Sequence, residues 1–137
     1  MSAGKYRVVI DTILWISFLL TTDFTKLDRL LLNNQVILLV SPELLEEIVE
    51  VAERPKFRKY FELSDLSDLL FALRQKAELI QVHSQIDVCR DVKDNFLLSL
   101  AVDGAATHIL TGDKDLLVLH PFGDIQILTI SEYLSDK

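Results

Sequence analysis

Short apolar runs alternate with segments of helical periodicity along the chain. The apolar runs predict five strands, over residues 6–10, 36–40, 79–82, 108–111 and 125–128. Apolar positions spaced three and four apart predict helices between them, over residues 12–20, 24–34, 42–54, 65–77, 94–103 and 114–119, with a terminal turn at 131–134. Several strands are apolar throughout, so we predict an α/β domain whose parallel sheet is covered on both faces.

Polar residues at the ends of the helical segments indicate where the helices begin. Asp23 is predicted to cap the second helix, which ends near residues 33–34. Ser41 and Pro42 suit the cap and first position of the third helix. Ser64 is the predicted cap of the fourth helix.

Composition favours a single globular domain over residues 1–137. Half of the 137 residues are hydrophobic, and the one cysteine, Cys89, has no internal disulfide partner. No run of about 18 apolar residues is present, and Asp11 interrupts the first apolar segment too early for a secretory signal. We therefore expect a cytoplasmic protein with no membrane span. A formal net charge of -7 argues against binding nucleic acid through a generally basic surface.

Acidic residues follow two of the predicted strands. Asp11 directly follows the first strand, and Asp113 follows the fourth by one glycine. The carboxyl ends of parallel strands meet at one edge of a sheet, which is where sites form in such folds. Asp94 shares a helix face with apolar residues three, four and seven positions later, so it lies at the inner tip of a buried stripe.

Each of these acids also has a simpler interpretation as a helix cap. Asp11 and Asp113 could cap the helices that follow them, and Asp91 and Asp94 could cap their own helix reciprocally. Independent caps would have no need to meet at one sheet edge. If the acids do meet, a cation must hold them ionised, and oxygen ligands suit Mg²⁺ or Mn²⁺.

The third helix carries further acids. Glu43 and Glu50 are predicted to point away from the core, whereas Glu46 and Glu47 flank its apolar face on opposite sides. Either of the latter two could reach a pocket, and periodicity leaves the choice open.

Four motifs in this order resemble the PIN domain family, in the group assigned to toxin components of toxin–antitoxin systems. They are VVIDT at 8–12, SPELLEE at 41–47, RDVKDN at 90–95 and TGDKDLL at 111–117. The resemblance implies a three-layer α/β/α domain with a mainly parallel sheet. It also implies a Mg²⁺- or Mn²⁺-dependent ribonuclease, a hydrolase acting on single-stranded RNA, with an antitoxin protein as partner.

The family's acidic site is carried over onto matching positions. The four principal acids are Asp11, Glu47, Asp94 and Asp113, of which Asp11, Asp94 and Asp113 would be metal ligands. Supporting positions are Asp115, Thr111 and Asp91. By analogy, a metal-activated water attacks the phosphodiester in line and the 3′ oxygen leaves. Glu47 would act through a water or a second metal, and the sequence does not separate ligand from base.

Two departures from the family pattern concern the site. Ile13 stands where the family usually has a small polar residue, often asparagine, and its loss would loosen hydrogen bonding around the metal. Val92 and Lys93 replace the commoner proline and acid, and Lys93 would offset local negative charge. The alternative function is therefore a catalytically weak or inert domain that binds RNA or a protein.

One segment, RPKFRKYF at 54–61, interleaves basic and aromatic residues. It is a candidate RNA-binding segment through Arg54, Lys56, Arg58 and Lys59. A solvated basic face with its aromatics in the core is the favoured alternative, and contact with an antitoxin is another.

The resemblance further implies a homodimer, because members of the family commonly dimerise. The candidate surface lies on the first helix, at Leu14, Trp15, Phe18 and Leu19. Burial of these side chains in the core is the favoured interpretation.

Overall fold

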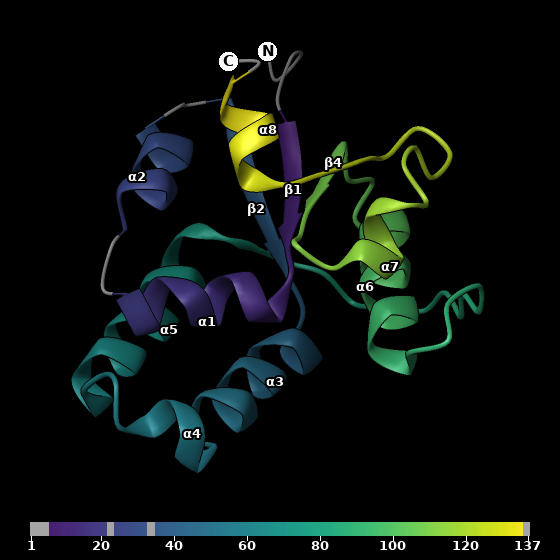
Figure 1. Ribbon diagram of the computed structural model, residues 1–137. Coiled ribbons are helices and arrows are strands. Elements are labelled where there is room, and N and C mark those ends of the chain that lie inside the picture. The colour runs from purple at the N-terminus through teal and green to yellow at the C-terminus, as the bar shows by residue number, and fades with distance from the viewer. Residues whose placement is uncertain (1–5, 22–23, 33–34, 136–137) are drawn as a thin grey trace.

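A computed structural model of the protein describes residues 6–21, 24–32 and 35–135. The described strands form one sheet in the order β3-β2-β1-β4-β5, and every neighbouring pair of strands is parallel (Figure 1). The strands are β1 (Tyr6–Ile10), β2 (Val36–Val40), β3 (Glu78–Leu79), β4 (His108–Leu110) and β5 (Gln126–Leu128). The predicted parallel α/β architecture is thus confirmed.

Helices cover both faces of this sheet. They are α1 (Thr12–Thr21), α2 (Thr25–Leu32), α3 (Pro42–Ala52), α4 (Pro55–Arg58), α5 (Leu63–Lys76), α6 (Val92–Asp103), α7 (Lys114–Leu117) and α8 (Ile130–Ser135). In Figure 1, α6 and α7 lie on one side of the strands, and α1, α3 and α5 lie on the other. Right-handed crossovers produce this division, because the chain runs from β1 to β3 in one direction across the sheet and from β4 to β5 in the other. Within the described ranges, no helix is long and apolar enough to cross a membrane.

The order in which successive strands are added to the sheet changes side between β1 and β4: β2 and β3 lie beyond β1, and β5 lies beyond β4. These two strands are neighbours, and their register pairs Ile10 with Leu110. The residues that follow, Asp11 and Thr111, therefore leave the sheet side by side. Such a reversal opens a crevice at the carboxyl edge of a parallel sheet, and this crevice holds the candidate site.

The core interpretation of α1 is confirmed for three of the four candidate residues of the dimer surface. Trp15, Phe18 and Leu19 are buried, and Leu14 is half-buried against the core. They belong to the same core as the last three residues of β1, and α1 contacts α3, which carries Glu47.

Several predicted boundaries are wrong, among them those of the third strand and the start of α5. The third strand begins at Glu78 rather than Leu79 and ends at Leu79, because the chain turns away once the Ile80 amide has donated to the Val40 carbonyl. Ser64 lies inside α5, whose cap is a reciprocal pair in which the Asp65 carboxylate accepts from the Glu62 amide at 3.1 Å.

The predicted terminal turn is instead the helix α8, which contacts α2 and β5. The predictions for Asp23 and residues 33–34 lie outside the described residues.

Candidate active site

Thr111 joins the ends of β1 and β4. Its hydroxyl donates to Asp11 Oδ2 at 2.7 Å, and its oxygen accepts from the Asp113 amide at 3.0 Å. The Asp11 amide in turn donates to the Leu110 carbonyl at 3.0 Å, which extends the strand pairing by one residue. Because Thr111 is almost fully buried, these bonds hold the two acids in fixed positions.

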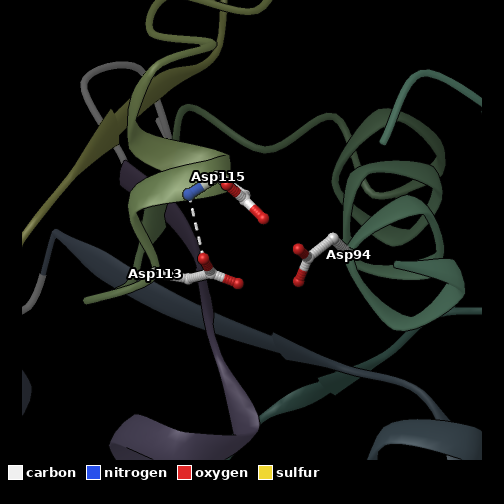
Figure 2. A group of neighbouring side chains, drawn as sticks. All are labelled: Asp94, Asp113 and Asp115. Atoms are coloured by element: carbon white, nitrogen blue, oxygen red, sulfur yellow. Dashed lines mark hydrogen bonds between the residues drawn. The ribbon is translucent and has the colours of Figure 1, made fainter. Parts of the chain in front are cut away.

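Three carboxylates face one another beside this link. Asp113 caps α7 by accepting from the Asp115 amide at 2.9 Å, and this places both acids at the start of that helix. Asp94 projects toward them from α6 (Figure 2). One carboxylate oxygen from each of the three lies within 4.8 Å of the others. We call these three residues the acidic triplet.

Asp94 is the buried member of the triplet. Its side chain is 7% exposed, and no described N–H or O–H group donates to its Oδ2 atom. The pKa of Asp94 is raised to about 7, first by burial and then by the neighbouring carboxylate of Asp113. Asp113 acts in this direction because only the protonated form of Asp94 can donate to it. The negative charges of Asp91 and Asp11 act in the same direction. No ion pair among the described residues involves Asp94, so no cation there holds it ionised.

Asp11 lies beside the triplet rather than within it. Burial raises its pKa, and the charges of Asp113 and Glu47 raise it too, whereas hydrogen bonds from Thr111 and from the Ile13 amide lower it. These two bonds set the direction of the Asp11 carboxylate and leave lone pairs free for a ligand.

Glu47 reaches the site from α3. Its Oε1 atom accepts from the Thr12 hydroxyl at 3.0 Å, and its Oε2 atom lies 3.4 Å from Lys93 Nζ. Glu46 instead lines a separate cavity of about 630 Å³ between α3, α5 and β3. Tertiary structure thus separates two glutamates that periodicity left equivalent.

A pocket of about 430 Å³ gathers most of the predicted site residues. Its lining consists of Asp11, Thr12, Ile13, Glu47, Val51, Arg54, Asp91, Lys93, Asp94, Gly112 and Asp113. Thr111 lies beneath it through its bonds to two of these residues, and Asp115 stands next to it in the triplet.

Capping accounts for part of the acidic pattern. Asp91 caps α6 by accepting from the Lys93 amide at 2.9 Å, so its interpretation as a cap is confirmed. The reciprocal bond predicted for Asp94 is absent from the described hydrogen bonds. The Asp94 carboxylate faces Asp113 and Asp115 instead. Asp113 both caps α7 and belongs to the triplet.

Three residues that contribute to the site carried no functional assignment from sequence. Thr12 holds Glu47, and Arg90 lies 3.3 Å from the Asp115 carboxylate. Asn95, a buried polar residue within an apolar helix face, accepts from the Val88 and Cys89 amides at 3.0 and 2.7 Å. The sequence could have singled out Asn95 by its position in that apolar face, because a buried amide needs hydrogen-bond partners.

The Ile13 side chain is 59% exposed at the pocket. The hydrogen bond that Asp11 receives at this position comes from the Ile13 backbone amide, which any residue would supply. Loss of a polar side chain at position 13 therefore leaves Asp11 with both of its donors.

The basic segment lies mostly outside the pocket. Arg54 lines the pocket and sits 3.6 Å from Glu50, whereas Lys56, Arg58 and Lys59 lie over the rings of Phe57, Phe61 and Tyr60 at 5.0, 5.9 and 5.3 Å. Phe61 is buried and Phe57 half-buried, as the core interpretation predicts. Tyr60 is 56% exposed, so part of its ring remains accessible to a base although Lys59 lies over it.

Comparisons with known proteins agree with this architecture. Residues 7–115 match the PIN domain family. An uncharacterized protein of Methanocaldococcus jannaschii is 34% identical over 122 residues, which cover 87% of this chain and 78% of the relative. PIN domains are generally metal-dependent nucleases that act on RNA. The chain belongs to the PIN domain family.

Proposed function

We propose that the protein is an endoribonuclease that cleaves single-stranded RNA with the help of Mg²⁺ or Mn²⁺. The observation that supports this most is the Asp94 Oδ2 atom, which is buried, faces two further carboxylates and receives no hydrogen bond from the described residues. A buried acid without a donor needs either a proton or a cation. Three carboxylate oxygens at this spacing offer hard ligands, which suit Mg²⁺ and Mn²⁺.

The residues divide into ligands and supports. Asp94, Asp113 and Asp115 would hold the ion, and Asp11 would complete the site from the end of β1. When bound, the ion acidifies water and offsets negative charge at the phosphate that is attacked. Thr111 holds Asp11 and Asp113 in place through the two hydrogen bonds of its hydroxyl group.

Glu47 provides a separate carboxylate at the pocket wall. Thr12 and Lys93 hold it there, within the same pocket as Asp11 and Asp94. From this position it can orient a water molecule or accept a proton from it.

The surroundings of the pocket suit a flexible polyanion. Arg54 lines the pocket, and α4 continues away from it with Lys56 and Lys59 exposed. A single strand can follow these charges with its phosphates and stack a base on Tyr60, whereas a duplex keeps its bases stacked inside.

The biological role in the proposal is that of a toxin in a toxin–antitoxin pair, acting in the cytoplasm. It is supported by the four motifs from VVIDT to TGDKDLL, which resemble that group of the family. An antitoxin partner and a homodimer belong to the same proposal. Growth arrest on expression, absent for Asp94→Asn, would test the role in cells.

Cleavage of single-stranded RNA with Mn²⁺ tests the enzymatic proposal directly. We expect Asp94→Asn to lower the cleavage rate by at least about 100-fold, because it removes the buried ligand and several kcal/mol of charge stabilisation. Asp68→Asn, at an exposed position on α5, is the matched control and should cleave like the unchanged protein.

Two results would contradict the proposal. Equal cleavage by Asp94→Asn and the control would remove Asp94 from the mechanism. RNA binding without cleavage, together with no uptake of Mn²⁺ in calorimetry, would favour the binding-only domain.

A further inference from the structure

The carboxylates of the pocket differ in how their charges are balanced. The acidic triplet includes an oxygen that no described group donates to, on Asp94. Glu47, in contrast, has a partner on each oxygen, the Thr12 hydroxyl at 3.0 Å and the Lys93 ammonium at 3.4 Å. Asp94 therefore has no cationic partner among the described residues, whereas Glu47 already has one.

Lys93 supplies the positive charge beside Glu47. Its own amide donates to the carboxylate of Asp91, which fixes its backbone in the first turn of α6. Its side chain then spans from α6 to Glu47 on α3. The Glu47 side chain is 23% exposed and the Lys93 side chain 54% exposed, so the ion pair is shielded from water on the Glu47 side.

The other cations of the site are committed elsewhere. Arg54 lines the pocket but sits 3.6 Å from Glu50 on α3. Arg90 reaches Asp115 at 3.3 Å, and its side chain is 89% exposed. Lys93 is thus the described cation that neutralises Glu47.

Glu47, Asp11 and Lys93 line the same pocket of about 430 Å³. Without Lys93, Glu47 and Asp11 would leave a second pair of carboxylates there. Two such carboxylates could hold another divalent ion, because repulsion between like charges favours any cation placed between them.

We infer that the Lys93 ammonium occupies the role of a second metal ion, so that the pocket binds one divalent cation, at the acidic triplet. Lys93 is a positioning residue in this arrangement: it keeps Glu47 out of the metal's ligand set and at the pocket wall. The inference rests on the proposed function to the extent that the triplet binds a divalent ion.

The stoichiometry of Mn²⁺ binding, measured by calorimetry and by electron paramagnetic resonance, tests the inference without any activity assay. We expect about one Mn²⁺ per chain in the unchanged protein and about two, the second weaker, in Lys93→Gln, because the freed Glu47 and Asp11 then share a cation. Lys93→Arg keeps the charge and should bind about one Mn²⁺. Lys76→Gln, an exposed change on α5, is the matched control and should also bind about one.

A double variant identifies the ligand. Adding Glu47→Gln to Lys93→Gln should abolish the second binding event, because the released carboxylate is gone. Two Mn²⁺ ions in the unchanged protein, or an unchanged stoichiometry in Lys93→Gln, would overturn the inference while leaving the proposed nuclease intact. Absence of any Mn²⁺ binding to the unchanged protein would overturn both. Circular dichroism of each variant confirms that it is folded.

Discussion

Asp94 illustrates how one side chain can favour function at the expense of stability. It is buried beside Asp113 and within reach of the charges of Asp91 and Asp11. An apolar residue of the same size would avoid this repulsion. The arrangement is useful only if a cation binds, because the cation then converts the repulsion into attraction.

The raised pKa of Asp94 predicts how stability depends on pH without metal. Its folded-state pKa of about 7 lies above the ordinary value of 3.8, so between these values the folded protein keeps a proton that the unfolded chain loses. The free energy of unfolding should therefore fall as pH rises from about 4 to about 7. Asp94→Asn cannot ionise, and at about pH 8 it should be more stable than the unchanged protein by about 1–4 kcal/mol.

Urea denaturation at about pH 4 and about pH 8, in a chelator, provides the measurement. At the lower pH, Asp94→Asn and the unchanged protein should differ little in their free energy of unfolding. Asp94 is protonated in the folded protein at this pH, and in the unfolded chain it is only partly ionised. Asp68→Asn should follow the pH dependence of the unchanged protein. A constant difference between Asp94→Asn and the unchanged protein at both pH values would show that the effect is one of packing and not of charge.

Among the elements, α6 does more than carry Asp94. Its polar residues Asn95, Ser99 and Asp103 are spaced four apart, so they lie along one edge of the helix. They accept hydrogen bonds from backbone amides of the segment 83–89, which runs antiparallel to the helix before turning into it. This edge holds an irregular segment against α6 and so fixes where Asp91 enters the pocket.

The end of α6 packs closely on the sheet at Gly104, which gives a second prediction. A Cβ atom there would lie 2.9 Å from Leu39 Cδ1 and 3.1 Å from the Leu100 carbonyl oxygen. We expect Gly104→Ala to lower the free energy of unfolding by about 1–3 kcal/mol, because the buried neighbours must move.

Gly112 is the matched control, since a Cβ atom there would meet nothing within 4 Å. Gly112→Ala should change stability by less than about 0.5 kcal/mol. Thermal and urea denaturation of both variants would measure the difference. Equal stability of the two variants would mean that the α6–β2 contact is looser than the structure shows.

At the scale of the molecule, the proposed function requires an acidic protein to bind an acidic substrate. The net charge of -7 opposes approach of RNA, so the local basic segment has to compensate. Lys56 and Lys59 are its exposed members beyond the pocket.

We expect Lys56→Gln/Lys59→Gln, made in Asp94→Asn to prevent cleavage, to weaken binding of single-stranded RNA. The slope of log affinity against log salt should become shallower by about 0.7 for each phosphate that the variant no longer neutralises. Fluorescence anisotropy across a salt series measures both quantities. Arg74→Gln/Lys76→Gln on α5 removes the same charge elsewhere. If it weakens binding equally, the effect comes from net charge and not from this segment.

Several features of the fold followed from local sequence. β1 and β2 have the predicted bounds because each is a short apolar run that ends at a polar residue. The third strand was misplaced because it is a two-residue edge strand, and the chain beyond it bonds to Asp103 through residues 83 and 84 instead of continuing the sheet. Contacts of that kind, twenty residues apart, leave no periodicity in the sequence.

For the site, the sequence by itself determined which acids stand at the ends of β1 and β4 and which one faces inward on α6. Those properties depend on neighbours a few residues away. Helix periodicity left Glu46 and Glu47 equivalent, the family resemblance chose Glu47, and in the structure Glu47 lines the pocket and Glu46 does not. Tertiary structure alone decided that Lys93 meets Glu47 and that Asp94 Oδ2 receives no donor from the described residues. These outcomes depend on distances between α3, α6 and α7 across the sheet edge, and packing of the whole domain sets those distances.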